Sequence, residues 1–292
     1  MSHVLIQGLV FGVLAGGVYA LMSSGMAMIF GVMRMVNLGH AAIMLTGSYI
    51  AVTLLSQFHV DPLVSIPIIM VLFLVVGALF ERGILGRFLG GDLALAVLVT
   101  LGLANILEGG QGVIWTSRFY TIRTSYSFNT FNLFGLYVPL IRIIAAAEAA
   151  VLLLTLWVIL TRTNLGRSIR ATIQNRAVAQ LVGVNVGRVT MIAFAIGVAM
   201  AGAAGPLMGM LYTWYPDSHW LWGGKIVAII VLGGLSSLRG ALLASMLLGI
   251  AEQVVTLGID VRWAPMVFYL FLMLVMLLRP QGLLGSVHRE LA

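Results

Sequence analysis

Long apolar runs make up most of this chain, and short polar segments separate them. A helix needs about 20 mainly apolar residues to cross a hydrocarbon core about 30 Å thick. The runs are continuous rather than alternating, which favours membrane-spanning helices over a β-barrel. The pattern predicts an all-α polytopic membrane protein with about eight or nine transmembrane helices. The runs cover, approximately, residues 4–30, 38–56, 63–80, 92–114, 138–160, 190–211, 223–236, 240–257 and 264–278.

Two of these runs contain breaks that favour discontinuous helices. The first run passes through Gly31 to Asn37, Gly39 and His40 before an apolar stretch resumes. The second, between the pairs Gly223–Gly224 and Gly233–Gly234, is too short for a normal crossing. Irregular backbone at membrane depth persists only where it is buried in protein or lines a wet cavity. Paired breaks of this kind indicate a transport site.

Small residues recur at intervals of four in two places, which predicts close helix packing in lipid. The first set opens the first half of the chain and consists of Gly8, Gly12, Gly16 and Ala20. The second set opens the second half and consists of Gly197, Ala201, Gly205 and Gly209. The first stripe enters the membrane from the outside and the second from the inside. This relation predicts an inverted internal repeat, which is common among transporters.

One long polar segment, from Arg162 to Arg188, carries five arginines and no acid. Basic loops between spans face the cytoplasm. The segment therefore places itself and the C-terminus inside, and the N-terminus outside. The loop from Trp115 to Tyr137 fits less well, because it is assigned outside yet contains Arg118 and Arg123. Aromatic residues between Tyr212 and Trp222 are expected to anchor the external interface.

The same segment has two interpretations that the residues leave open. The segment can be a solvated loop that sets the membrane topology, and this interpretation alone explains its arginines. As a docking element, it would form a cytoplasmic helix, because Ile169, Ile173, Ala177 and Leu181 recur at helical spacing.

The composition excludes several classes of protein. Of the 292 residues, 61% are hydrophobic and 9% are charged, whereas soluble domains carry about a quarter charged residues. The net charge of +7 is explained by loop arginines and does not indicate a nucleic-acid partner. The single lysine, Lys225, precedes Ile226 and not Ser or Thr, so the chain has no Walker A loop. Without cysteine, or HExxH or GxSxG motifs, we expect no enzyme activity, no metal site and no cofactor in this chain.

Several polar residues interrupt the spans, and we expect them to face the bundle interior. An ion at the bilayer centre costs about 2.5–3.5 kcal/mol, so such residues are candidates for a translocation path. For the acids, structural pairing or placement near a headgroup is the competing interpretation. The candidates are Asn37, His40, Thr100, Asn105, Glu108 and Glu252.

Four blocks in order resemble the branched-chain amino-acid ABC transporter permeases of the Liv H type. They are YALMSSGMAMIFGVMRMVNLGHAAIMLTGSY (Tyr19–Tyr49), GRSIRATIQNRAVAQLVGVNVGRV (Gly166–Val189), GGKIVAIIVLGGLSSLRGALLASMLLGIAE (Gly223–Glu252) and LRPQGLLG (Leu278–Gly285). The chain departs from the family pattern at Asn37-Leu38-Gly39-His40-Ala41 and at Ala244-Ser245. These departures bear on the solute more than on the fold.

The resemblance implies a fold and a set of partners. The fold is that of a type II-like ABC importer permease, a single transmembrane domain over residues 1–292 in a bacterial inner membrane. The partners are a second, related permease, two ATPase subunits that bind ATP and Mg²⁺, and a solute-binding protein. The solutes are branched-chain amino acids, other amino acids, amides or urea. A coupling loop at about 161–189 docks on the ATPase, through Arg167, Arg170, Asn175, Arg176, Ala179, Leu181 and Gly183.

Two other functions remain open from the residues. A stand-alone secondary transporter would use Glu108 or Glu252 as its coupling acid. A passive channel, or a scaffold without transport activity, would need no ATPase.

Overall fold

The computed structural model describes residues 2–88, 93–133, 136–279 and 281–284, and nearly all of them are helical. Pro280 and Gly285 of the Leu278–Gly285 block lie outside these residues. The helices are α1 (Ser2–Met33), α2 (His40–Phe58), α3 (Pro62–Gly83), α4 (Leu93–Trp115), α5 (Leu140–Arg162), α6 (Asn164–Gln174), α7 (Arg176–Leu181), α8 (Val186–Leu211), α9 (His219–Gly233), α10 (Leu238–Gly258) and α11 (Ala264–Leu278). Short 3-10 turns cover Leu85–Arg87, Ser125–Phe128, Pro216–Ser218 and Val261–Trp263.

In the described part of the chain, eight segments are long and apolar enough to cross a membrane. They contain α1, α2, α3, α4, α5, α8, α10 and α11. The helix α9, with 15 residues, is shorter than a normal crossing. The prediction of an all-α polytopic membrane protein is confirmed. A small exception is a hairpin of strands β1 (Thr130–Leu133) and β2 (Leu136–Pro139), in which Thr130 pairs with Pro139.

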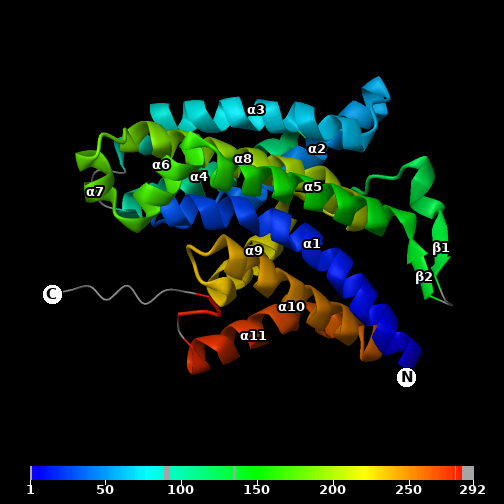
Figure 1. Cartoon of the computed structure of the whole chain (residues 1–292). Helices are drawn as coiled ribbons and strands as arrows, with labels where there is room; N and C mark the ends of the chain where they lie inside the picture. Colours follow the sequence, from blue (N-terminus) through cyan, green and yellow to red (C-terminus); the bar gives the residue numbers. More distant parts are fainter. Residues whose placement is uncertain (1, 89–92, 134–135, 280, 285–292) are drawn as a thin grey trace.

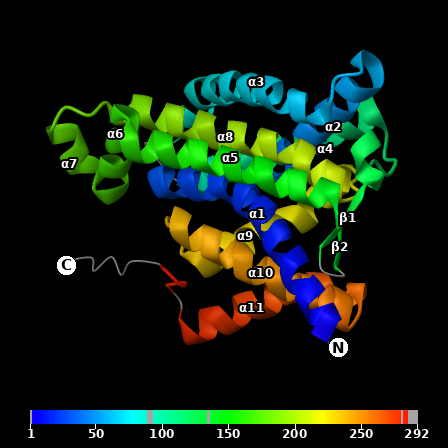
Figure 2. The ribbon, with the colours of Figure 1, turned by 45° about the vertical axis from the view of Figure 1, so that its right-hand side comes forward.

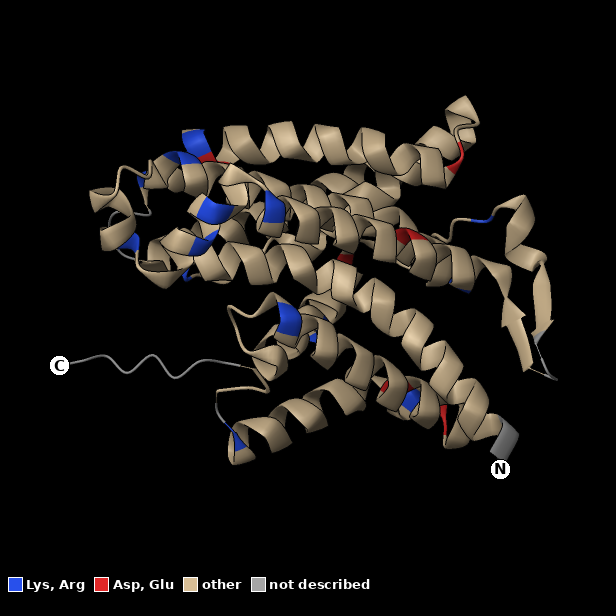
Figure 3. Ribbon diagram, viewed as in Figure 1, with Lys and Arg blue, Asp and Glu red and all other residues tan. Residues whose placement is uncertain are grey.

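The two ends of the bundle differ in charge and in structure. We call the end that carries α6 and α7 the arginine end, and the end that carries β1 and β2 the hairpin end. Most Lys and Arg residues gather at the arginine end (Figure 3). The N-terminus of α1 lies at the hairpin end and α11 runs towards the arginine end (Figure 1). The two ends of the described chain therefore lie on opposite sides of the bundle.

Of the eight membrane-spanning segments in the described residues, α8 is the most buried, with 83% of an apolar 18-residue stretch buried. It contacts α1, α2, α3 and α5. A Cβ at Gly205 would lie 2.3 Å from the carbonyl oxygen of Met44 in α2, so only glycine allows this approach. On α1, a Cβ at Gly12 would lie 2.4 Å from the Cα of Ile250 in α10. Gly8 and Gly16 also face α10, whereas Gly197 faces Ile29 of α1 and Gly209 faces Trp214.

The contacts of the two halves correspond. The first half runs through a long helix (α1), a non-helical return, a shorter helix (α2) and α3. The second half repeats this order with α8, a return, α9 and α10. The extensive contact of α10 with α1 matches that of α3 with α8. In both views α1 lies between α3 on one side and α10 and α11 on the other (Figures 1 and 2). Because α1 ends at the arginine end and α8 begins there, the two long helices run in opposite directions, as an inverted repeat requires.

Two of the aromatic residues after α8 differ from the expectation of interface anchors, whereas Trp220 is 49% exposed. Trp214 and Trp222 are 0% and 4% exposed. Trp214 stacks edge-on against Tyr49 of α2, and its backbone bridges to Tyr120. These rings pack inside the protein because the chain returns into the bundle after α8 instead of remaining at the headgroup level.

Candidate functional site

The segment between α1 and α2 is a return into the bundle. Helix α1 ends at Met33, and the next residue, Arg34, has a left-handed φ of 55°. The chain then runs without helical structure to His40, whose Nε2 lies 2.9 Å from the carbonyl oxygen of Met22. At a rise of about 1.5 Å per residue, Met22 lies roughly 16 Å back along α1 from its end at Met33. Helix α2 therefore begins well inside the depth of the bundle.

Local hydrogen bonds and α4 hold this return segment. The side-chain oxygen of Asn37 accepts from the amide of Gly39 at 3.1 Å. Thr100 of α4 accepts from the amide of Leu38 at 3.1 Å. Asn37, His40 and Thr100 are each 0% exposed. Among the described residues, Nδ2 of Asn37 and Nδ1 of His40 find no hydrogen-bond partner. Buried polar atoms of this kind are rare in folded proteins, so these two atoms are available to a water molecule or a ligand.

The second return follows α8 and ends beside the first. Helix α9 begins at His219, whose Nδ1 lies 3.0 Å from the carbonyl oxygen of Pro216. A Cβ at Gly223, one turn into α9, would lie 3.6 Å from the Cβ of Ala41 at the start of α2. The first turns of the two interrupted helices therefore meet inside the bundle.

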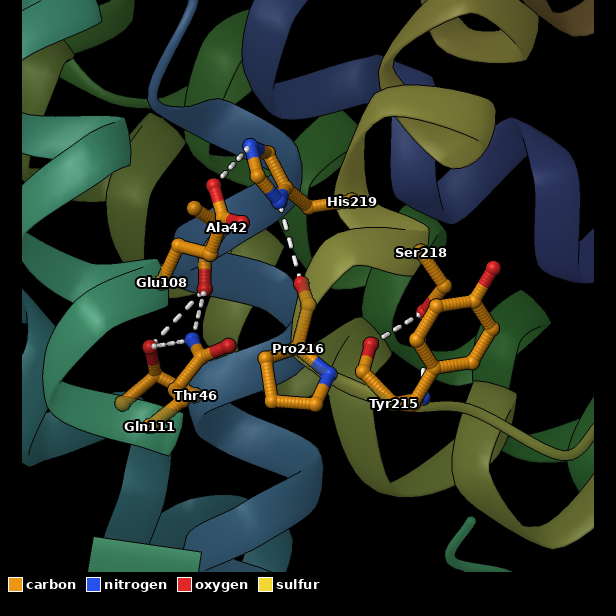
Figure 4. Close-up of polar contacts among 8 residues, drawn as sticks. All are labelled: Ala42, Thr46, Glu108, Gln111, Tyr215, Pro216, Ser218 and His219. Carbon is orange, nitrogen blue, oxygen red and sulfur yellow. Dashed lines mark hydrogen bonds and ion pairs between the residues drawn. The ribbon is translucent and has the colours of Figure 1, made fainter. Parts of the chain in front are cut away.

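Helix α4 connects both returns (Figure 4). Oε2 of Glu108 lies 3.8 Å from Nε2 of His219. One turn further, Gln111 donates to the carbonyl oxygen of Ala42 at 3.0 Å and to the hydroxyl of Thr46 at 2.8 Å. The Glu108 side chain is 30% exposed and that of His219 is 1% exposed. The polar face of α4 thus touches α2 and the start of α9, and Glu108 also reaches the surface of this chain.

A cavity of about 450 Å³ lies beside Glu108 at the hairpin end. Its polar lining comes from Asn105, Glu108, Ser117 and Asp217, and Gly109 and Gly112 widen it. Asn105 is exposed, although it lies within a membrane-spanning helix. Carboxylates and amides are suitable acceptors for an ammonium group.

Glu252 belongs to a different cluster, in which every polar group is paired. Its Oε1 lies 2.6 Å from Nζ of Lys225, and its Oε2 accepts from the Tyr19 hydroxyl at 2.5 Å. The Tyr212 hydroxyl lies 2.8 Å from that of Tyr19. The rings of Trp222 and Phe268 each lie with their centroids 4.8 Å from Nζ of Lys225. Aromatic faces attract cations, and the two side chains of this ion pair are only 8% and 6% exposed.

The path residues predicted from the sequence thus divide into three groups. Asn37, His40 and Thr100 meet at the first return, and Asn105 and Glu108 share the cavity on α4. Glu252 lies apart, paired with Lys225. Sequence reasoning missed His219, Lys225, Tyr19 and Tyr212. A signal for Lys225 was present, because it is the single lysine of the chain and lies in an apolar run.

The predicted coupling segment is two helices and not one. Thr163 caps α6 and Asn175 caps α7, each through a side-chain oxygen that accepts a backbone amide at 3.0 Å. The predicted apolar set is therefore divided, with Ile169 buried and Leu181 86% exposed. Ala179 is 2% exposed, and Gly183 has a left-handed φ of 85°. Arg167, Arg170 and Arg176 are exposed around these helices.

Comparisons with known proteins agree over almost the whole chain. The family described as branched-chain amino acid transport system, permease component, matches residues 8–278. The chain is 30% identical to the high-affinity branched-chain amino acid transport system permease protein BraD of Pseudomonas aeruginosa, over 98% of this chain and 97% of that protein. It is 27% identical to the LivH permease protein of the same kind of system in Escherichia coli K12, with the same coverage.

A second permease of that system in E. coli K12, LivM, is also 27% identical, over 94% of this chain and 69% of LivM. Both the family match and these relatives cover the two return segments, α4 and the ion pair. This multi-pass membrane chain belongs to the family of branched-chain amino-acid transport system permease components.

Proposed function

We propose that this chain forms one half of the translocation path of an ATP-driven importer. Its cargo is a branched-chain amino acid or a related small polar solute, such as another amino acid, an amide or urea. The observation that carries the proposal is the meeting of the two return segments beside the polar face of α4. Interrupted helices at matching places in two halves are typical of transport sites.

We place a second permease subunit against the outer face of α4, on the other side of the path. Asn105 is exposed there, and a Cβ at Gly102 or Gly109 would meet no atom of this chain within 4 Å. A polar side chain facing lipid is unfavourable, and small residues allow close helix contact. The second subunit would be a related permease, since this chain is similar to both LivH and LivM.

The arginine end suits an ATPase contact on the cytoplasmic side. Basic loops face the cytoplasm, and α7 presents the exposed apolar side chains of Val178, Leu181 and Val182 at its tip. We place the two ATPase subunits, with their ATP and Mg²⁺, against this tip. The hairpin end then faces outwards and receives the solute-binding protein. Exposed Phe128, Phe131 and Tyr137 lie on that side.

The functional test begins with gentle purification of the tagged chain and mass spectrometry of what accompanies it. We expect P-loop ATPases and a second permease. The purified assembly, reconstituted in liposomes with its binding protein, should accumulate leucine only when ATP is present. A lone chain that moves solute without ATP would overturn the proposal and favour a secondary transporter or a channel.

Contact with the ATPase is tested at the tip of α7. Leu181→Asp should leave assembly in the membrane unchanged but lower ATP-dependent uptake by about tenfold or more, because a charge would be buried in an apolar contact. The matched control is Ile259→Asp, since Ile259 is 73% exposed at the opposite end. Equal uptake by both variants would rule out this docking position.

A further inference from the structure

A basic cavity lies at the arginine end, between α3, α7 and the start of α8. Its volume is about 840 Å³. Four arginines line it (Arg82, Arg87, Arg176 and Arg188), together with one acid, Glu81. We call this cavity the arginine cup. It is separate from the return segments and from the cavity beside Glu108.

Within the described residues, the positive charge of the arginine cup is offset only in part, by Glu81, whose carboxyl group interacts electrostatically with Arg176. Glu81 is 5% exposed, whereas all four arginines are exposed. Within the described residues, none of the four has a carboxylate oxygen within 4.0 Å. Asn185, which also lines the cup, caps α8 by accepting the amide of Arg188 at 3.0 Å. The positive end of the 26-residue helix α8 therefore points towards the same space.

An apolar surface leads directly to the cup. Ile68, Leu72, Val75 and Leu79 form a stripe at helical spacing along α3, each between 45% and 66% exposed. Arg82 continues this stripe by one further turn. A soluble anion would use the cup alone, whereas a ligand with an anionic head and long apolar chains would use both surfaces.

We propose that the arginine cup binds the phosphate headgroup of an anionic phospholipid, whose acyl chains lie along the outer face of α3. Basic pockets between membrane helices on the cytoplasmic side recognise such headgroups. Planar guanidinium groups bind phosphate oxygens in a bidentate manner. The site is independent of the solute that the protein carries.

Native mass spectrometry of the full-length protein tests the proposal. The protein is exchanged into equal parts of phosphatidylglycerol and phosphatidylcholine before its bound lipids are counted. The parent should retain phosphatidylglycerol in preference to phosphatidylcholine. In R82Q/R87Q/R188Q this preference should fall by about tenfold or more. The matched control is R118Q/R123Q/R262Q, which removes the same charge from exposed positions at the hairpin end and should behave like the parent.

Two further arms separate the alternatives. R82K/R87K/R188K keeps the charge and should keep the preference for the anionic lipid, which guards against a folding defect in the glutamine variant. Inorganic phosphate should not displace the lipid, and complete displacement would reduce the cup to a simple anion site. Equal retention of phosphatidylglycerol by the cup variant and the hairpin-end control would overturn the proposal. If R82Q/R87Q/R188Q keeps its preference for phosphatidylglycerol but no longer binds the ATPase, the arginines form a protein contact and the proposal is also wrong.

Discussion

Two buried polar clusters of this protein differ in how completely their groups are paired. Around Lys225 and Glu252, both charges have partners at hydrogen-bonding distance, and aromatic rings enclose them. Around the return segments, Asn37, His40 and Gln111 keep buried atoms without a hydrogen-bond partner among the described residues, and Glu108 adjoins a cavity. A satisfied network holds one structure, whereas an incomplete network next to a cavity is available to a ligand or to a second conformation. We therefore expect the first cluster to stabilise the fold and the second to serve transport.

The largest expected effect comes from breaking the closed cluster. Glu252→Leu or Lys225→Met would each leave an uncompensated charge inside the bundle and should cost about 3–5 kcal/mol of stability. The double variant Lys225→Met with Glu252→Leu removes both charges and should recover most of this loss. Thermal unfolding of the purified protein, followed by tryptophan fluorescence, measures all three.

Glu148→Leu is the matched control for this experiment. Glu148 is a partly buried acid of α5 without an ion-pair partner within 4.0 Å in the described part of the chain. It should tolerate replacement far better than Glu252. If the double variant unfolds as early as the single ones, the pair does more than neutralise itself and the assignment of a purely structural role is wrong.

An intermediate effect is expected at the open cluster, on transport and not on stability. Glu108→Gln removes the charge that faces His219 at 3.8 Å but keeps a hydrogen-bonding side chain. A partly exposed ion pair of this length contributes about 0.2–1 kcal/mol, so ATP-driven uptake should fall by roughly fivefold at most. The melting temperature should not change.

Glu148→Gln serves as the control, because it neutralises an acid away from the returns. Complete loss of uptake in Glu108→Gln alone would instead indicate an acid that couples transport to protons. Such a result would revive the secondary transporter as the function of the chain.

The sequence predicted the spans and the breaks well, because each rests on a local signal. Apolar runs are bounded by polar residues, and Asn37, Gly39 and His40 interrupt one run at a single place. The meeting of the two returns was not predictable in detail, since it depends on helix packing between residues far apart in sequence. Lys225 and Glu252 are separated by 27 positions, and no spacing rule links a residue of α9 to one of α10.

The coupling segment shows a local signal that was available but not used. Helical spacing from Ile169 to Leu181 predicted one helix, whereas Asn175 is a strong N-cap residue and begins a second helix. The sequence cannot fix which arginines surround a cavity, because the arginine cup joins α3 and α8 across more than 100 residues.

The smallest expected effect comes from an ion pair at the surface. Arg262 and Asp260 lie 2.8 Å apart, but their side chains are 84% and 32% exposed. Hydrogen bonds from the side chain and the backbone of Arg262 lower the pKa of Asp260. Stability from a lowered carboxyl pKa is present above the ordinary value of about 3.9 and is lost as the pH falls through the lowered value.

The variant Asp260→Asn keeps the capping bond to the Arg262 amide. Because exposed ion pairs contribute little to stability, its melting temperature near neutral pH should equal that of the parent. Any difference in melting temperature between Asp260→Asn and the parent should disappear at acidic pH, where Asp260 of the parent is protonated. A loss of stability in Asp260→Asn as large as that in Glu252→Leu would mean that an ion pair stabilises this protein whether or not it is buried. Pairing alone, and not enclosure by aromatic rings, would then distinguish the Lys225–Glu252 cluster from the cluster at the return segments.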